Sequence, residues 1–334
     1  MQGITTQDLD TLLENYEVGC AKPVQDNDVF EAAMRQKMDA MFADKLPRFD
    51  FRVISRTYRL SHEGVDKVKR GCYEEASDAF RQAQTLMDSY PLIVAGRRIA
   101  LAQINAAESY LDYRRGRFAA AEQRLRTALA CEDVLENDLK YLHYHIHRVH
   151  LVENLSRIFW FSSSSENASA LMGCLIGYLH GARPDPGVGG HWSKENLNLV
   201  ERDILRQKFA QIFSTFAMSL QRLNTQEALP ALMRLLDAAG APPSEWLLPQ
   251  CAEWIDLKLA LFHSDRTEFL ARAARYLAAG GGGIPVLWTL TAAEAAGTCR
   301  RAGWTNHPLQ QRIERDLARV ASPILKSVIT KSLN

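Results

Sequence analysis

A pattern of five residues occurs twice in this chain, and the two copies lie 45 positions apart. The first copy is Gly71, Tyr73, Ala76, Phe80 and Ala83; the second keeps every spacing at Gly116, Phe118, Ala121, Leu125 and Ala128. A glycine ends a helix at little cost, because the left-handed conformation carries no Cβ penalty there. Apolar residues three and four apart then form one face of the next helix, where alanines let two helices approach closely. The repetition therefore predicts tandem helical hairpins.

These residues resemble the second half of the tetratricopeptide repeat (TPR), and the resemblance covers residues 57–131. In the first copy, Leu60 and Gly64 fall where that family has its leucine and small residue; the second copy has Asn105 and Ser109 there. Both copies lack the family's tryptophan, and their spacing exceeds the usual repeat of about 34 residues. The resemblance implies an all-α fold, a TPR-like superhelix of antiparallel helix hairpins with long and irregular helices.

Composition excludes several classes of protein. The chain has 334 residues, of which 47% are hydrophobic and 24% charged, with a net charge of +1. These values describe a globular protein and argue against nucleic acid and anionic lipid as partners. Six cysteines are spread singly without zinc-ligand spacing, which predicts buried thiols in a reducing compartment. With no signal peptide and no apolar run of membrane length, we expect a cytoplasmic protein.

Turn signals divide the chain into four parts. We expect an N-terminal helical cap or docking arm at 1–50, TPR-like repeats at 51–181, a Gly/Pro loop at 182–192, and C-terminal helical hairpins with a basic capping helix at 193–334. Individual helices are expected near 8–16, 28–43, 92–115, 134–161, 193–222, 226–239, 284–302 and 308–333. Ser193, Thr225 and Ser244 are the expected N-caps of three helices in the last part.

Four of the nine histidines gather between His143 and His150. On a continuous helix His143, His147 and His150 share one face, which also takes Glu136. In the TPR family, the first helix of each pair lines the concave surface, so the resemblance implies a binding groove over this helix and the preceding long one. The groove residues expected on this basis are Arg97, Asn105, Tyr113, His143, Tyr144, His147, Arg148 and Asn154.

The same histidines leave a metal site open as an alternative. Two histidines one turn apart reach a common divalent ion, so Glu136, His143, His147 and His150 form the candidate ligand set. No H-E-x-x-H motif is present, and no phosphate-binding loop accompanies the glycine-rich segments. Plain surface histidines are the third interpretation. We therefore expect no cofactor, with a divalent metal as the alternative.

Three functions follow from these features. The first is a non-enzymatic adaptor, chaperone or regulator that binds a protein or peptide in a superhelical groove, a signal-peptide receptor being one form of it. The second is a metal-dependent enzyme or accessory factor centred on the histidines. The third is an RNA-binding helical repeat, which the near-neutral charge disfavours. Partner identity and self-association stay open.

Overall fold

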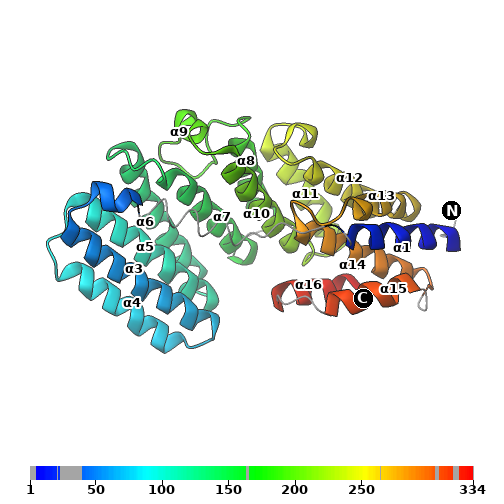
Figure 1. Ribbon diagram of the computed structural model, residues 1–334, viewed down its shortest axis with the longest axis horizontal. Coiled ribbons are helices and arrows are strands. Elements are labelled where there is room, and N and C mark those ends of the chain that lie inside the picture. Colours follow the sequence, from blue (N-terminus) through cyan, green and yellow to red (C-terminus); the bar gives the residue numbers. More distant parts are fainter. Residues whose placement is uncertain are drawn as a thin grey trace. The chain divides into compact units, whose positions relative to one another are not determined.

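The computed structural model describes residues 5–20, 22, 40–162, 165–263, 265–304, 308–318 and 323–333. Within these ranges the regular structure is helical and contains no strand, which confirms the all-α class (Figure 1). The chain forms two compact units. One consists of Met1–Asn27 and Leu205–Asn334, and the other of Asp28–Ile204. No helix in the described ranges is long and apolar enough to cross a membrane.

In the unit Asp28–Ile204, the helices from Arg48 to Leu179 each pack on the next along the chain, and the short helix Lys194–Asn198 packs on the helix Tyr144–Ser162. Short connections make neighbouring helices antiparallel, and α3 also packs on α5. Residues 40–45 are helical too, whereas the rest of the helix expected at 28–43 lies outside the described residues. The elements are α3 (Arg48–Lys69), α4 (Tyr73–Asp88), α5 (Val94–Arg114), α6 (Phe118–Asn137), α7 (Tyr144–Ser162), α8 (Ser165–Leu179) and α9 (Lys194–Asn198).

The glycines of the repeated pattern end α3 and α5 as predicted. Gly71 has φ 82° and Gly116 φ 73°, the left-handed region that favours glycine. After α3, the amide of Cys72 donates to the carbonyl of Lys67 at 2.9 Å, which closes a Schellman motif; an equivalent bond follows α5. The two hairpins therefore turn by the same local geometry.

The apolar residues of the pattern form the interiors of the two hairpins. Tyr73 and Phe118 are partly buried at the starts of α4 and α6. Ser109, which takes the place of Gly64 in the second copy, is buried and donates its hydroxyl hydrogen to the carbonyl of Ala106 at 2.6 Å. The remaining pattern residues are at most 1% exposed: Ala76, Phe80, Ala83, Ala121, Leu125 and Ala128.

The long helix expected over 134–161 is wrong, because α6 ends at Asn137 and α7 begins at Tyr144. Between them, Lys140 has φ 60° and the amide of Tyr141 donates to the carbonyl of Leu135 at 2.9 Å. This turn buries the ring of Tyr141 in the same apolar cluster as Leu135 and Tyr144. Burial of an aromatic side chain thus outweighs continuation of the helix.

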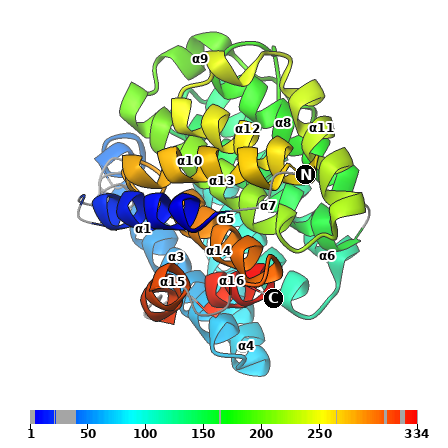
Figure 2. The same cartoon turned by 90° about the vertical axis from the view of Figure 1, so that its right-hand side faces the viewer.

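The other unit combines α1 with the helices of the C-terminal half. α1 (Thr6–Cys20) packs along α13 (Arg266–Ala279), and α14 (Pro285–Arg301) packs on α15 (Pro308–Ala318) and α16 (Pro323–Leu333) (Figure 2). A Cβ atom on Gly19 would lie 1.9 Å from the carbonyl oxygen of Leu277, so only glycine permits this approach of α1 to α13. The elements are α1 (Thr6–Cys20), α10 (Arg202–Leu220), α11 (Thr225–Ala239), η1 (Pro243–Glu245), α12 (Pro249–Phe262), α13 (Arg266–Ala279), α14 (Pro285–Arg301), α15 (Pro308–Ala318) and α16 (Pro323–Leu333).

Two helices expected in this half are divided. The helix expected at 193–222 is α9 followed by α10, and the one at 308–333 is α15 followed by α16. Pro323 is the first residue of α16, a position that proline tolerates because the amide there has no partner within the helix, and residues 319–322 lie outside the described residues. The break before α10 has no comparable proline or glycine.

Of the three expected N-caps, one is confirmed and two are wrong. Ser193 caps α9 and accepts a hydrogen bond from the amide of Asn196 at 3.1 Å, as predicted. The cap of α11 is Asn224 and not Thr225. Ser244 caps no α-helix, because it lies inside η1 and α12 starts with a proline at residue 249.

A buried ion pair joins α12 to α14. Lys258 is 2% exposed and contacts Glu294, which also accepts a hydrogen bond from Gln221, the residue after α10. The ammonium group lies over the rings of Trp254 and Phe262, at 5.4 and 5.1 Å from their centroids. Pairing and the cation–π contacts compensate for the lost hydration of the lysine.

None of the six cysteines forms a disulfide bond. Cys131, Cys251 and Cys299 are buried, as predicted. Cys20, at the end of α1, is exposed, so the expectation of uniformly buried thiols is wrong there. Burial raises the pKa of Cys299 to about 12, which keeps that thiol protonated and unreactive.

Candidate functional site

A row of polar side chains runs along one face of α7. His147, His150, Asn154 and Arg157 are three or four residues apart and all partly exposed. Residues with this spacing return to the same side of a helix at each turn. We call these four residues the α7 stripe. It contains three of the expected site residues and adds Arg157.

Members of the α7 stripe are hydrogen-bonded to one another. Asn154 Nδ2 lies 3.2 Å from His150 Nε2, and Arg157 Nη1 donates to Asn154 Oδ1 at 3.2 Å. The rings of His147 and His150 have centroids 6.1 Å apart. These contacts restrict the side-chain rotamers before any ligand arrives, so less conformational entropy is lost on binding.

Two buried carboxylates contact the basic side chains of the α7 stripe. Glu132 of α6 and Glu153 of α7 are both fully buried. Glu132 Oε1 lies 2.6 Å from His147 Nδ1, and Glu153 contacts both Arg157 and His150, the latter at 3.5 Å. Burial raises the pKa of Glu132, and the neighbouring His147 opposes that shift. The acids fix the orientation of the basic groups and balance part of their charge.

An aromatic group lies at the C-terminal end of α7. Phe161 is 47% exposed, and its ring centroid is 5.5 Å from that of Tyr113 and 6.3 Å from that of Phe118. Tyr113 is therefore beside α7, at the end of α5, as expected for a shared surface. Asn105, two turns earlier on α5, is partly exposed and donates to the carbonyl of Leu101 at 2.8 Å.

Tyr144 and Arg148 do not line an open groove, so that part of the expected site is wrong. Each is 1% exposed. Tyr144 packs in the apolar cluster with Phe42 and faces away from solvent. Arg148 is held between carboxylates, at 2.6 Å from Glu136 Oε2 and 2.8 Å from Asp133 Oδ1. On α7 these two positions lie on the side that faces the core.

The carboxylate of Glu136 is the centre of this buried network. Glu136 Oε1 lies 2.6 Å from His145 Nδ1 and accepts a hydrogen bond from Asn196 Nδ2, also at 2.6 Å. His145 Nε2 in turn lies 2.9 Å from the hydroxyl of Tyr178. Burial alone would raise the pKa of Glu136, but hydrogen bonds from His145, Arg148 and Asn196 hold it below its usual range.

The same network contacts the C-terminal end of the glycine-rich loop at 182–192. Arg148 donates to the carbonyl of His191 at 2.9 Å, and its guanidinium lies 4.0 Å from the ring centroid of Trp192. Trp192 is 8% exposed and also packs against Tyr178. This loop lies inside the unit Asp28–Ile204, and its end is fixed by charge and stacking.

The remaining expected groove residues lie apart from the stripe. His143 is exposed in the turn before α7 and so does not share a helical face with His147. Arg97 is exposed near the start of α5 and pairs with Asp88 at 3.2 Å. It is two turns from Asn105, about 12 Å along the helix. Of the expected groove, the structure brings together His147 and Asn154 on α7, with Tyr113 at its end.

The candidate metal ligands are separated by the same geometry. Glu136 is bound by His145, Arg148 and Asn196 in the core, whereas His147 and His150 are partly exposed. In the described ranges, no group of three or more His, Cys, Asp or Glu residues is arranged to hold a metal ion. His147 Nδ1 is directed at Glu132, which is not in the proposed ligand set.

The sequence patterns do not predict the residues that contact the α7 stripe from the protein interior or that form the buried network beside it. Glu132, Glu153 and Arg157 were not singled out, nor were His145 and Trp192. A usable signal exists for Glu153 and Arg157, since they are four residues apart on one helix, a spacing that favours an ion pair. Glu132 and His147 lie on different helices, and no local pattern relates them.

Comparison of the chain with protein-family models, with curated proteins and with solved structures finds no match.

Proposed function

We propose that this chain is a non-enzymatic binding protein with a TPR-like arrangement of helix hairpins, and that the α7 stripe contacts a peptide segment of a partner protein. The repeated glycine turns and alanine-lined interfaces support the architecture. The contact of α3 with α5 also supports it, since first helices of successive TPR hairpins adjoin one another.

One observation carries the binding role: the α7 stripe is a partly exposed polar row already ordered by buried acids. Glu132 and Glu153 hold the basic groups in place, and Asn154 joins them laterally. A surface that is ordered in the free protein binds with a smaller entropy loss than one that must be ordered by its ligand. Hydrogen-bond donors in such a row suit the carbonyl or carboxylate oxygens of a peptide.

An apolar anchor adjoins the polar row. Phe161 is exposed beside Tyr113, and exposed aromatic rings commonly supply the strongest contacts of a binding surface. The combination favours a peptide that carries an apolar side chain near the Phe161 end and polar groups along the stripe. No observation in the described residues favours the metal-dependent or RNA-binding alternatives over this one.

The test begins with recovery of partners on immobilised protein and identification of the bound proteins. Titration calorimetry with the recovered partner then compares the wild type with His150→Ala/Asn154→Ala. A matched control is Gln123→Ala/Thr127→Ala, which removes two polar side chains one turn apart on α6. We expect the first variant to weaken binding at least about tenfold, or about 1.4 kcal/mol, and the control to leave it unchanged. Equal binding by all three proteins would reject the α7 stripe as the contact surface.

A further inference from the structure

Four arginines on the exposed face of α3 have no acidic partner among the described residues. Arg48, Arg52, Arg56 and Arg59 are three or four residues apart and all exposed, so they form one row along the helix. Elsewhere on this hairpin, Lys67 pairs with Glu63 at 2.8 Å and Lys69 with Asp66 at 3.3 Å. We call the four residues the arginine stripe.

The arginine stripe opposes the stability of its own helix. Like charges one turn apart on a helix are destabilising. Arg48 is also the first residue of α3, where the helix dipole is positive. The acidic residue in that turn, Asp50, is 4% exposed and accepts a hydrogen bond from the amide of Ile93 at 2.9 Å, so it faces α5. Among the described residues, no acidic side chain therefore pairs with the exposed positive charge of the stripe.

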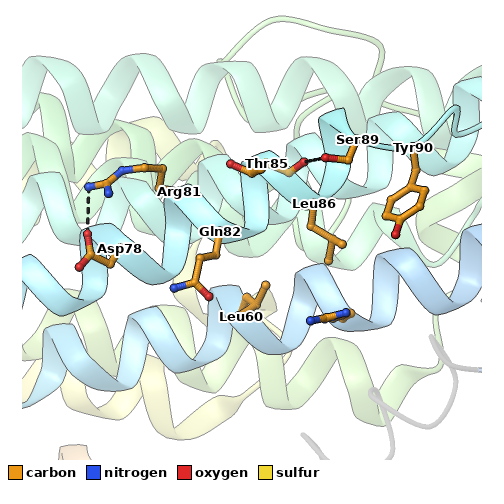
Figure 3. A pocket seen from close by; sticks show the side chains of 9 residues that line it. Leu60, Asp78, Arg81, Gln82, Thr85, Leu86, Ser89 and Tyr90 are labelled. Atoms are coloured by element: carbon orange, nitrogen blue, oxygen red, sulfur yellow. Dashed lines mark hydrogen bonds and ion pairs between the residues drawn. The ribbon is translucent and has the colours of Figure 1, made fainter.

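A groove lined by polar residues, two leucines and a tyrosine lies beside this charge. It is formed between α3 and α4, has a volume of about 560 Å³, and includes Arg56 in its wall. Leu60, Leu86 and Tyr90 extend into the space between the two helices (Figure 3). The basic group on the α4 side, Arg81, is paired with Asp78 at 2.9 Å, so the unpaired charge of the groove comes from α3.

Exposed apolar side chains continue the groove at one end. Tyr90 is 39% exposed and its ring lies edge-on to that of Phe49, which is 48% exposed, with 5.3 Å between centroids. Ile93 and Val94, at the start of α5, are 43% and 67% exposed. Clustered apolar residues bordered by charge are typical of a protein interaction surface.

We propose that the α3–α4 groove binds an acidic amphipathic helix of a partner protein. Carboxylates on one face of such a helix, also three and four residues apart, match the spacing of the arginine stripe, and its aliphatic side chains contact Leu60 and Leu86. Arginine pairs with carboxylates in a bidentate geometry that lysine does not offer. This surface is distinct from the α7 stripe, so failure of either proposal leaves the other standing.

The chemistry of the groove favours a peptide over a nucleic acid. A phosphate backbone is a uniform polyanion and would approach the α4 wall as well as α3. Asp78 lines the groove on that side and its side chain is 59% exposed, and α4 also carries the exposed carboxylates of Glu74, Glu75 and Asp88. Leu60 and Leu86 also line the groove, and an amphipathic peptide helix supplies apolar side chains that contact them, whereas a phosphate backbone does not.

The probe for this site is a synthetic fluorescent helical peptide of about 18 residues, about 27 Å long, with glutamates on one face and leucines beside them. Its control is a peptide of the same composition in scrambled order, and a third probe is a single-stranded RNA of similar charge. Fluorescence anisotropy measures each dissociation constant against the full-length protein at several salt concentrations, because charge-assisted binding weakens as salt increases.

Charge-matched variants locate the binding. Arg52→Glu/Arg56→Glu/Arg59→Glu reverses the stripe, and Arg202→Glu/Arg266→Glu/Arg275→Glu makes the same change of net charge at three other exposed arginines. We expect the first variant to weaken peptide binding at least about tenfold and the second by less than about twofold. Leu86→Gln, which changes no charge, should weaken binding as well. Circular dichroism checks that each variant keeps the helical content of the wild type.

Several results would overturn the proposal. Equal affinity for the ordered and scrambled peptides would mean attraction by charge alone. RNA binding that is tighter than peptide binding and lost in the stripe variant would assign the surface to nucleic acid. A dimer of the free protein that sedimentation detects, and that the stripe variant abolishes, would assign the surface to a second copy of this chain.

Discussion

The ring of Phe80 occupies the space that Gly64 leaves on the facing helix. A Cβ atom at residue 64 would lie 2.3 Å from Phe80 Cε1, inside contact distance, and Phe80 is fully buried. The repeated pattern thus encodes a specific pairing of α3 with α4. Glycine is needed here because of the neighbouring ring, and not because of the backbone conformation.

Gly64→Ala should therefore destabilise the protein, although alanine is the better helix former. The clash has to move a buried ring, and overpacking of this kind costs about 1–3 kcal/mol, against about 0.5–1 kcal/mol gained in helix propensity. Urea denaturation measures the change. In Gly64→Ala/Phe80→Leu the smaller side chain relieves the clash, so the double variant should lose less stability than the two single losses added together. Simple additivity would show that residues 64 and 80 do not interact.

The turn glycines test whether the two hairpins are equivalent. A Cβ on Gly71 or Gly116 would meet no atom within 4 Å, so only the positive φ opposes substitution. We expect Gly71→Ala and Gly116→Ala to lower the free energy of unfolding by similar amounts, about 1–2 kcal/mol each. Asparagine at the same positions should cost less, since it tolerates the left-handed conformation. Thermal melts followed by circular dichroism would detect a disparity between the two sites.

Removal of the Arg148 charge should lower the free energy of unfolding more than most single substitutions do. Arg148→Met leaves the carboxylate of Glu136 buried without its cationic partner, and breaking a buried pair in this way costs about 3–5 kcal/mol. The double variant Glu136→Gln/Arg148→Met removes the stranded charge and should recover part of that loss. Denaturant titration tests both. If the double variant is no more stable than Arg148→Met, the carboxylate of Glu136 is not the source of the damage.

The contributions of two α6 glutamates to stability should depend on pH with opposite signs. The pKa of Glu136 is lowered in the folded protein, so its contribution is present above the unfolded value near 4.5 and is lost as the pH falls through the folded value. The pKa of Glu132 is raised, so the folded state favours its protonated form and stability decreases as the pH rises through the range above that value.

Two variants measure how each glutamate changes the pH dependence of the free energy of unfolding. Above about pH 4.5, the stability of Glu132→Gln relative to the wild type should increase with pH, whereas around and below pH 4.5 the stability of Glu136→Gln relative to the wild type should decrease as the pH rises. Each variant serves as the other's control, because both remove one carboxylate from the same helix. Urea titrations at a series of pH values give the two slopes, and slopes of the same sign would contradict the assignment of one of the shifts.

Zinc or nickel should not raise the melting temperature. His143 lies outside α7 and Glu136 is bound in the core, so the expected ligand set is not assembled. A ligand that binds only the folded state raises the melting temperature in proportion to the logarithm of its concentration. A rise that His147→Ala and His150→Ala both abolish would restore the metal site. Metal analysis of the purified protein provides an independent check.

Local sequence signals predicted the parts of this fold that depend on local physics. The turn at Gly71 follows from the conformational freedom of glycine, and the buried face of α4 follows from residue spacing. The break before Tyr144 was missed, because it depends on burial of Tyr141 against residues remote in sequence. His143 was accordingly placed on a helix that does not extend so far.

The candidate site was predictable to the same degree. Spacing on one helix correctly placed His147 and Asn154 on a common side of α7. It could not decide which side of α7 faces the core, since His145 and Arg148 are polar residues that a buried acid compensates. The polar character of a residue is a poor guide to exposure wherever a partner from another helix neutralises its charge.

The packing of α1 on α13 has a consequence for biosynthesis. The two helices belong to one unit but are separated by the whole of the other unit, so α1 leaves the ribosome long before α13 exists. During that interval, Leu9, Leu12 and Tyr16 lack the surface that buries them in the finished protein. The inserted unit can complete its own core first, whereas the outer unit must wait for the last third of the polypeptide. Chaperone contact during synthesis is therefore expected to concentrate on the first twenty residues.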